Sequence, residues 1–364
     1  MKKALLILLA LAMLLFIPAC GQTAPPASGA SEPSAPAEKT PAPAPADTPA
    51  PAPADTPTPA PTEPPAPTPD AALPVSVYVL SGTTGFGMAN LICAAQRGEA
   101  ALNYSFSVES DASNVTAALL NGSADIACLP TNAASALYNK TSGAVQVIAL
   151  NTLGVLYLLS DGSVPVSSLS DLEGQTVYVP AQNPSFIFAK LCAEAGVNVT
   201  IDNSYAQPAE LNAAVAAKSV PLAVLPEPLV TIARSQNPDM TVALDLTVEW
   251  DKVAPAGSLV QGCAVVRRAF AEAHPTELAA FLDEYGDSIS SLQSDPETGA
   301  QSIETAGVFA KAAVAKKAIP NCNLCFITGA DMIAPLGQYL TLMWEANPNS
   351  VGGTVPGDDF YYVP

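Results

Sequence analysis

Hydroxyl and amide side chains recur just after short apolar runs that have the composition of strands. These groups donate and accept hydrogen bonds, which suits contact with a small polar solute. One carboxylate joins them at Glu227, between two prolines, where it would accept a hydrogen bond from an amino group or a cationic centre. The candidate binding residues are Ser81, Gly82, Thr83, Thr84, Pro130, Thr131, Asn132, Asn151, Thr152, Gln182, Asn183, Ser185, Phe186 and Glu227.

Each of these residues also has a purely structural explanation. Ser, Thr and Asn commonly cap helices, and for any single one of them capping explains its place as well as binding does. Glu227 would equally serve as a latch between lobes by capping a backbone N–H. Rings that would stack on a planar solute, but that are more often core, belong to Phe86, Phe186, Tyr205 and Trp250. Binding is favoured because five strand-to-helix junctions share the same polar chemistry.

Periodicity predicts the elements that place these residues, an α/β domain over about 73–364. Strands are expected at 75–80, 104–108, 126–129, 145–150 and 155–159, then at 176–179, 199–201, 222–225, 241–246 and 262–266. Helices are expected at 86–97, 111–120, 132–138, 184–195, 208–217 and 228–235, then near 277–292, 297–318 and 329–345. Asn183 is the expected cap of the helix that Pro184 begins. Two α/β lobes in series are the simplest arrangement.

The charged residues argue against nucleic acid and against the common catalytic sites. There are 33 acids and only 14 Lys and Arg, a formal net charge of -19, which disfavours a phosphate backbone as partner. The only histidine, His274, precedes a proline, and no GxSxG motif occurs. The glycines at 82–87 lack the spacing and the lysine of a phosphate-binding loop. We therefore expect no cofactor, no metal and no enzyme activity.

Six cysteines follow Cys20 along the chain. Four lie singly in apolar runs and are interpreted as small buried residues. Cys322 and Cys325 form a CxxC without a second pair or nearby histidines. Free thiols or a local disulfide are favoured there over a metal or redox site.

The amino terminus has the pattern of an export signal over 1–20. A positive start precedes an apolar run at 4–17 that is short for a bilayer-spanning helix. Ile-Pro-Ala-Cys at 17–20 resembles the bacterial lipobox, which implies that Cys20 is acylated and becomes the mature amino terminus. The alternative is an ordinary secreted protein with a cysteine at the cleavage site.

Residues 21–72 are almost entirely Pro, Ala, Thr and Ser with a few acids. This composition predicts a disordered, extended spacer with nothing to bury. A glycosylated stalk or a ligand for proline-reading domains are further roles that the same composition allows.

Three segments together resemble a known family. They read LNGSADIA at 120–127, DLEGQTV at 171–177 and PEP at 226–228. With the order of elements, they resemble the nitrate/sulfonate/taurine and thiamine-precursor group of ABC transporter solute-binding lipoproteins. The resemblance implies a type II periplasmic binding protein fold. Lobe one would span about 73–165 and 262–364, lobe two about 166–261, with the ligand cleft between them.

The same resemblance implies a place in transport. The carboxy-terminal helices should pack on lobe one, and the domain should close on a small solute. It would then deliver that solute to ABC permease and ATPase subunits while a lipid anchor holds it at the membrane, facing outside the cytoplasm.

The solute class is less constrained. None of the candidate loops holds Lys or Arg, so a strongly anionic solute would depend on helix amino termini alone. A nitrogen-bearing heterocycle or an amine is favoured, and a sulfonate or nitrate remains an alternative. The competing functions are a sensory or adhesive surface module with the same fold and, behind it, a hydrolytic enzyme. Loss of uptake on deletion would separate transport from sensing, and turnover of a bound compound would identify an enzyme.

Overall fold

The computed structural model describes residues 68–364, within a compact unit that spans Pro64–Pro364. The predicted signal segment with Cys20, and most of the predicted spacer, lie outside the described residues. Asp70 already contacts the folded domain, because its N–H donates to Glu277 Oε1 (2.9 Å). The domain therefore begins slightly before the expected boundary at 73. Within 68–364, no helix has both the length and the apolar character that crossing a membrane requires.

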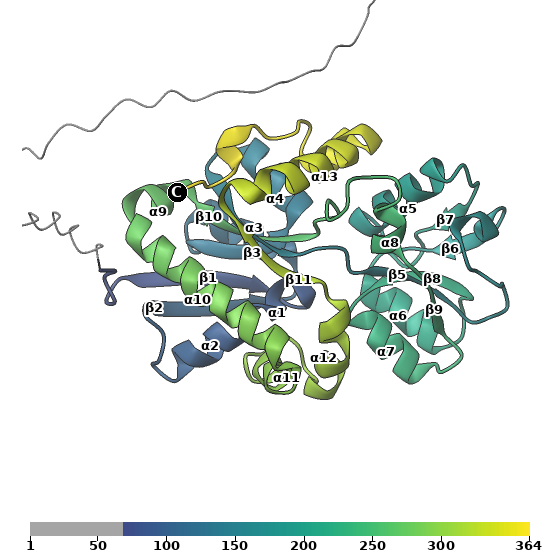
Figure 1. Cartoon of the computed structure of the whole chain (residues 1–364), viewed down its shortest axis with the longest axis horizontal. Coiled ribbons are helices and arrows are strands. Elements are labelled where there is room, and N and C mark those ends of the chain that lie inside the picture. Colours follow the sequence, from purple (N-terminus) through teal and green to yellow (C-terminus); the bar gives the residue numbers. More distant parts are fainter. Residues whose placement is uncertain (1–67) are drawn as a thin grey trace, which may run out of the picture. The chain divides into compact units, whose positions relative to one another are not determined.

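The first lobe is built on a six-stranded sheet with the order β11-β4-β10-β3-β1-β2. Its strands are β1 (Pro74–Leu80), β2 (Asn103–Glu109), β3 (Ile126–Pro130), β4 (Val145–Thr152), β10 (Gly262–Arg267) and β11 (Leu324–Thr328). β1 pairs in parallel with β2 and β3, and β10 runs antiparallel between β3 and β4. The carboxyl ends of β1 to β4 therefore share one end of the sheet, the end toward the second lobe (Figure 1).

The second lobe is built on a five-stranded sheet with the order β7-β6-β8-β5-β9. Its strands are β5 (Leu156–Ser160), β6 (Thr176–Tyr178), β7 (Thr200–Asp202), β8 (Leu222–Pro226) and β9 (Thr241–Asp245). β6 runs parallel to β7 and β8, whereas β5 runs antiparallel to β8 and β9.

The placement of β5 corrects the predicted lobe boundary. The strand predicted at 155–159 falls within the expected bounds of lobe one, but as β5 it pairs with β8 and β9 of the second sheet. The first crossing between lobes thus lies near Gly154 rather than near 165. A fully apolar run shows that a strand is buried but not which sheet it joins.

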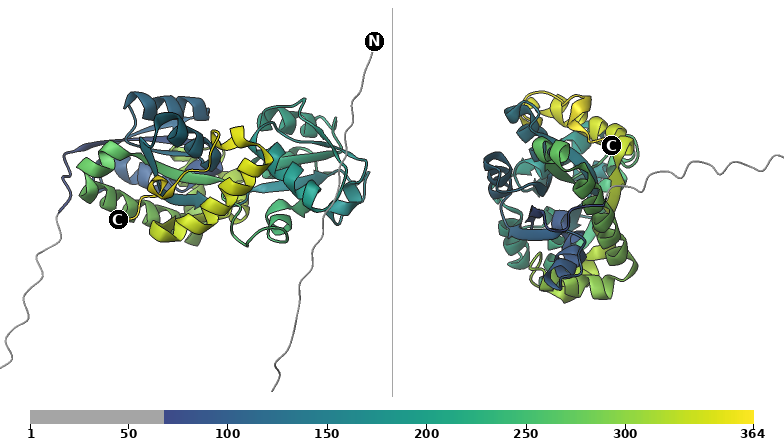
Figure 2. Two further views of the ribbon diagram at one scale, coloured as in Figure 1. Left: turned by 90° about the horizontal axis from the view of Figure 1, so that it is seen from above. Right: turned by 90° about the vertical axis from the view of Figure 1, so that its left-hand side faces the viewer.

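Helices cover both faces of the first sheet (Figures 1 and 2). On one face, the core around Val75, Val77 and Val79 is completed by six helices. These are α1 (Thr83–Phe86), α2 (Ala89–Gln96), α9 (Arg268–Ala273), α10 (Pro275–Ser294), α11 (Pro296–Thr305) and α12 (Ala312–Ala318). The other face is covered by α3 (Ala112–Asn121), α4 (Thr131–Thr141) and α13 (Ile333–Ala346).

The second sheet is covered in the same way. One face carries α5 (Asn183–Glu194) and α8 (Leu246–Trp250), and the other carries α6 (Pro208–Ala216) and α7 (Leu229–Gln236). Short 3-10 helices complete the described chain at η1 (Leu169–Leu172), η2 (Ile319–Asn321), η3 (Gly329–Met332), η4 (Pro348–Val351) and η5 (Asp358–Phe360).

The lobes share part of one hydrophobic core. Residues of α13 pack on α4 of the first lobe and on α5 of the second, and the rings of Tyr339 and Trp250 lie 6.0 Å apart. Helices α10 to α12 pack on the first lobe, as expected of the carboxy-terminal helices, but α12 also contacts α7 of the second lobe and α13 bridges both lobes.

Two expected helices are broken and one strand was not expected. The helix predicted at 86–97 begins earlier, as α1, and restarts as α2 after Gly87. The helix predicted at 297–318 is interrupted between α11 and α12, where Gly307 takes a φ of 72°. β11 holds Cys325 and forms an edge of the first sheet, a role that the short run around the CxxC did not reveal.

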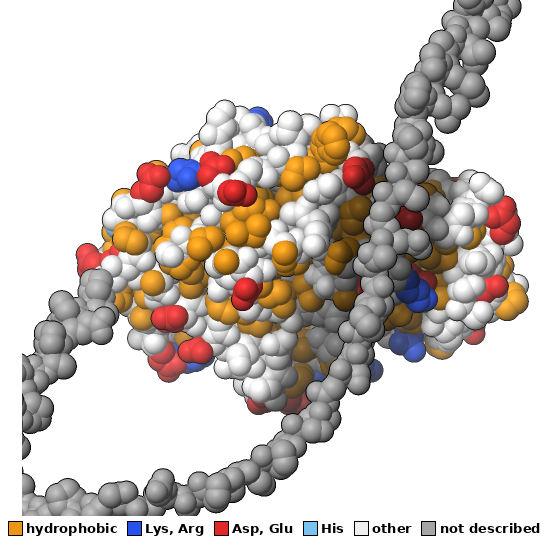
Figure 3. Space-filling view, turned by 45° about the horizontal axis from the view of Figure 1, so that its top comes forward, with side chains coloured by type: hydrophobic (Ala, Val, Ile, Leu, Met, Phe, Trp, Pro, Cys, Tyr) orange, Lys and Arg blue, Asp and Glu red, His pale blue; other side chains and the backbone are white. Residues whose placement is uncertain are grey.

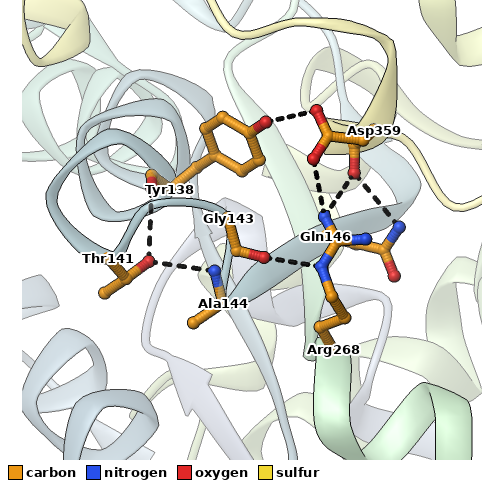
Figure 4. Close-up of polar contacts among 7 residues, drawn as sticks. All are labelled: Tyr138, Thr141, Gly143, Ala144, Gln146, Arg268 and Asp359. Carbon is orange, nitrogen blue, oxygen red and sulfur yellow. Dashed lines mark hydrogen bonds and ion pairs between the residues drawn. The ribbon is translucent and has the colours of Figure 1, made fainter.

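The chain end is fixed to the first lobe by a C-terminal clasp, which we define as residues 358–362. The Asp359 carboxylate accepts from Tyr138 Oη and from Arg268 Nη2, and Arg268 Nε donates to Gly143 O (2.7 Å) (Figure 4). Tyr362 N–H donates to Val147 O (2.9 Å), on the part of β4 that β11 does not reach. The clasp therefore extends the pairing of β4.

Candidate functional site

A cleft of about 670 Å³ lies between the two lobes. Its first-lobe wall comes from the segments that follow β1, β2 and β3 and from the end of β4. Its second-lobe wall comes from the segment after β8 and from the starts of α5 and α6. In α/β folds the ligand crevice lies outside the carboxyl ends of the strands, beside helix amino termini. The cleft occupies that position in both sheets.

Two backbone hydrogen bonds to other segments of the first lobe hold the turn after β1 in place. Ser81 N–H donates to Glu109 O (2.7 Å), and Gly82 N–H donates to Val308 O (3.2 Å). Gly82 has a φ of 90°, a left-handed conformation that favours glycine. Ser81 and Thr84 therefore line the cleft on a fixed backbone.

Glu227 is only 3 % exposed and joins the two lobes. Its backbone C=O accepts from Thr83 Oγ1 of the first lobe (2.6 Å). Its carboxylate accepts from Thr231 N–H (3.1 Å) and Thr231 Oγ1 (3.0 Å), and its Oε1 lies 3.5 Å from Asn321 Nδ2 of the first lobe. The contacts between lobes thus run through the Glu227 backbone C=O and Asn321, whereas the N–H that the carboxylate caps belongs to Thr231 of its own lobe.

The electrostatics of the cleft are set by this one acid. Burial raises the pKa of the Glu227 carboxyl above its ordinary value of 4.5, and the hydrogen bonds from Thr231 and Asn321 oppose that shift. Among the described residues, no Lys, Arg or His lines the cleft. Basic side chains are also few on the molecular face in Figure 3, where apolar groups occupy much of the larger lobe. An anionic solute would gain no ion pair from the cleft walls.

Two side-chain amides line the cleft with their oxygen atoms already bonded. Asn183 Oδ1 accepts from Tyr339 Oη (2.7 Å), and Gln261 Oε1 accepts from Val155 N–H (2.7 Å). Asn183 is not the cap of α5, because the helix begins at Asn183 and Gln182 stands at the capping position. The side chain of Asn183 instead contacts α13.

The structure brings part of the predicted site together. The predicted residues that line the cleft are Ser81, Gly82, Thr83, Thr84, Pro130, Thr152, Asn183 and Glu227. They come from both lobes, as the shared chemistry of the strand ends indicated.

Other predicted residues lie behind the cleft wall. Thr131 is fully buried and its Oγ1 donates to Val260 O (2.6 Å). Asn151 is also buried and its Nδ2 donates to Thr84 O (3.2 Å), so it positions a lining residue instead of being one. Asn132 has a buried Oδ1 without a partner among residues 68–364 and does not line the cleft.

The start of α5 directs its other predicted residues away from the cleft. Gln182 is exposed, Ser185 pairs with Asn203, and Phe186 packs against the shared core. A strand-to-helix junction can be predicted from sequence, but the helix face that turns toward the cleft depends on how the helix is docked.

The aromatic residues singled out for stacking are core or lie elsewhere. Phe86 and Trp250 are fully buried, and Trp250 Nε1 donates to Ser258 Oγ (2.9 Å). Phe186 and Tyr205 are half-buried outside the cleft lining. The aromatic side chain that does line the cleft is Phe309, whose ring meets that of Phe86 edge-on at 6.1 Å.

Several lining residues were missed by the sequence analysis. Ser110 directly follows β2, so the same junction rule would have found it. Gln207 stands at the start of α6, another such junction. Gln261 and the loop 307–310 come from distant parts of the chain, and only the fold brings them to the cleft.

The CxxC cysteines are free thiols in this structure. Cys322 Sγ donates to Ala318 O (3.1 Å), and Cys325 Sγ donates to Leu150 O (3.5 Å). Burial raises the pKa of the Cys325 thiol to about 12, which keeps it protonated at neutral pH. In the part of the chain that the structure describes, no group of three or more His, Cys, Asp and Glu residues is placed to hold a metal ion.

Comparison with known proteins shows which fold the chain has. No protein-family model matches the chain, and no curated protein matches its sequence. An ABC transporter structure from Parabacteroides distasonis matches with a TM-score of 0.69 at 22% identity, over 80% of this chain and 99% of that chain. The periplasmic aliphatic sulphonate binding protein SsuA from Escherichia coli matches with a TM-score of 0.64 at 14% identity, over 80% of this chain and 92% of its own.

A third structure is the CA3427 gene product of Candida albicans, which exhibits the generic periplasmic binding protein fold. It matches with a TM-score of 0.51 at 12% identity, over 79% of this chain and 93% of its own. This chain has the periplasmic binding protein fold. The predicted fold class, two α/β lobes, is thereby confirmed, and the structural neighbours include solute-binding proteins of ABC transporters. At these identities the comparisons define the fold, and the solute must be argued from the cleft.

Proposed function

We propose that this protein is the extracytoplasmic solute-binding component of an ABC importer. It captures a small polar solute between its two lobes, as a monomer, and delivers it to a membrane permease coupled to ATPase subunits. The observation that carries the proposal is the cleft at the carboxyl ends of both sheets, in a fold that a sulphonate-binding protein shares. Within the described lining only Glu227 is ionisable, and its carboxylate is engaged by Thr231, which favours binding over catalysis.

Closure is the proposed working motion. The lobes are linked by crossings near Gly154 and Gln261 and touch at the Thr83–Glu227 contact. A solute that contacts both walls favours the closed arrangement by its extra contacts there. Glu227→Ala keeps the backbone oxygen that Thr83 contacts but removes the carboxylate that faces Asn321 of the first lobe, and it is expected to weaken solute binding.

The solute is proposed to be a nitrogen-bearing heterocycle or an amine, with a sulfonate or nitrate as the alternative. The absence of Lys and Arg from the described lining supports this order, because an anion would depend on neutral donors and helix termini. Glu227 supports it less than expected, since Thr231 already donates to both carboxylate oxygens.

A thermal-shift screen of residues Pro64–Pro364 tests the proposal. The compounds are vitamins, pyrimidines, amines, sulfonates and nitrate. Stabilisation by at least one of them is expected, and stabilisation only by sulfonates or nitrate would overturn the preferred solute class. No response to any compound would contradict the binding function itself.

Membrane anchoring is a separate part of the proposal. We propose that Cys20 is acylated and that the domain is held outside the cytoplasm through the spacer at 21–72. The Ile-Pro-Ala-Cys pattern at 17–20 supports it. Metabolic labelling with palmitate should mark the wild-type chain and not Cys20→Ala. Equal labelling of both, or of neither, would contradict acylation at Cys20.

A further inference from the structure

Gln261 lies at one of the two crossings between the lobes and forms hydrogen bonds with both of them. Its N–H donates to Thr152 O (3.0 Å) at the end of β4, and its C=O accepts from Thr131 N–H (3.2 Å) at the start of α4. Its side-chain Oε1 accepts from Val155 N–H (2.7 Å), just before β5. One residue thus joins two strand ends of the first lobe to the segment that enters the second.

The hydrogen bond to Val155 fixes the orientation of the Gln261 amide. A backbone N–H can only donate, so the side-chain atom that faces Val155 must be the oxygen. The two N–H groups of Nε2 are left over, on a residue that lines the cleft. No residue within 68–364 accepts a hydrogen bond from Nε2, and Nε2 is not among the buried polar atoms that lack a partner. It is therefore accessible to solvent, on a residue that lines the cleft.

A second amide has the same arrangement across the cleft. Asn183 Oδ1 accepts from Tyr339 Oη, which leaves its Nδ2 as the free group on the second-lobe side. The cleft lining also includes apolar residues, among them Leu156, Leu229 and Phe309. The cleft thus offers neutral donors together with apolar surface.

We propose that Gln261 is a specificity-determining residue, whose Nε2 donates a hydrogen bond to an acceptor oxygen of the solute. This inference rests on the proposed function and deepens it. Of the proposed solutes, it selects a heterocycle with a carbonyl or carboxamide oxygen, or the alternative sulfonate, over a simple amine, whose donor groups leave both amides unpaired. Because Gln261 also holds Thr152 and Val155, the solute contacts the hinge itself.

Three aryl compounds that differ only in their polar group distinguish the solute classes. We propose calorimetric titration of residues Pro64–Pro364 with benzamide, benzenesulfonate and benzylamine, which present a neutral acceptor, an anionic acceptor and a cationic donor on one ring. The decisive variant is Gln261→Glu, which keeps an oxygen toward Val155 N–H and replaces the donor by an acceptor. The control is Gln236→Glu, an exposed residue at the end of α7 that carries the same charge change.

The wild type is expected to bind benzamide or benzenesulfonate. Gln261→Glu should weaken that binding by about 10- to 100-fold. The melting temperature of this variant should stay close to that of the wild type. Benzylamine binding should not weaken in this variant, and Gln236→Glu should leave all three affinities unchanged. A crystal structure of the wild-type unit with a bound probe gives a readout that needs no variant. The probe oxygen should then lie about 2.7–3.2 Å from Gln261 Nε2.

The outcomes distinguish this inference from the proposed function. Unchanged affinity in Gln261→Glu, or a probe oxygen that does not contact Nε2, would overturn the role of Gln261 and leave solute binding intact. Binding of benzylamine alone would do the same. If neither these probes nor any compound of the thermal-shift screen bound the wild type, both proposals would fall.

Discussion

The two lobes differ in how their parts are held together. The first lobe combines two distant chain segments around a six-stranded sheet, and the C-terminal clasp fixes its last residues to α4 and β4. The second lobe is one continuous segment, and two of its strands, β6 and β7, have three residues each. The first lobe is therefore the better braced half, and we infer that the second lobe moves relative to it.

The cleft walls differ in the same sense. The first-lobe wall combines hydroxyls at strand ends with the loop at 307–310, whereas the second-lobe wall begins at helix starts that contain Pro184, Pro208 and Pro228. The walls meet where Thr83 donates to the backbone of Glu227. Binding groups and stabilising contacts are therefore shared unequally between the lobes, which four changes would test.

The largest effect on stability is expected where the second lobe packs against α13 in the shared core. Trp250 is fully buried against Tyr339 of α13, so Trp250→Ala should lower the free energy of unfolding by about 3–5 kcal/mol. Trp344→Ala is the matched control on α13, because that ring is 40 % exposed. Denaturant unfolding of both variants measures the difference. Equal losses would mean that the lobes do not share a core at this point.

Next comes the bracing within the first lobe. Asp125 accepts from Ser76 N–H (2.9 Å) and pairs with Arg267, so it joins β1 to the returning strand β10. Asp125→Ala should cost about 1–3 kcal/mol of unfolding free energy, because half-buried donors on Ser76 and Arg267 lose their partner. The corresponding change in the second lobe, Asp239→Ala, breaks an exposed pair with Lys218 and should have little effect. A larger loss from Asp239→Ala would reverse the comparison.

The contact between the walls should matter less for stability than for closure. Thr83→Val removes the hydroxyl that donates to Glu227 O and keeps the shape of the side chain. We expect a more open domain by small-angle X-ray scattering and solute binding weakened by about 2- to 10-fold. Thr116→Val on α3, whose hydroxyl bonds only within its own helix, is the control. Unchanged scattering and affinity in Thr83→Val would argue against a latch.

The smallest effect concerns pH. The pKa of Glu227 is raised in the folded protein, so the folded state binds this proton more readily than the unfolded chain does. The resulting stabilisation is fully present below the ordinary pKa of 4.5 and is lost as the pH rises through the raised value. The melting temperature of the wild type relative to Glu227→Gln should therefore fall from about pH 4 to about pH 7. A difference independent of pH would contradict the burial of this carboxylate.

Local patterns predicted most of the fold because strands and helices differ in period. The run Val75, Val77, Val79 alternates in burial as a strand facing a helix layer must, and it became β1. The same reasoning could not assign β5 to a sheet, since all five of its residues are buried. Sheet membership depends on pairing between distant strands, which no local pattern contains.

The candidate site was predictable to the extent that it follows strand ends. Thr83 and Thr152 were found because parallel strands end together at the ligand crevice. Phe186 does not line the cleft, because the docking of α5 packs its ring against the core. Gln261 was missed, because it precedes a strand and reaches the cleft only through the return of the chain to the first lobe.

The central claim is that a small solute binds in the cleft between the lobes. Ser110 is exposed and lines this cleft at the end of β2, so Ser110→Trp would obstruct it, whereas Ser105→Trp places the same ring at an exposed position of the same strand. We propose to measure, by calorimetry, the affinity of both variants for the compound that most stabilises the wild type. Binding should weaken by about 100-fold or more in Ser110→Trp and stay unchanged in Ser105→Trp. Wild-type affinity in Ser110→Trp would contradict the claim.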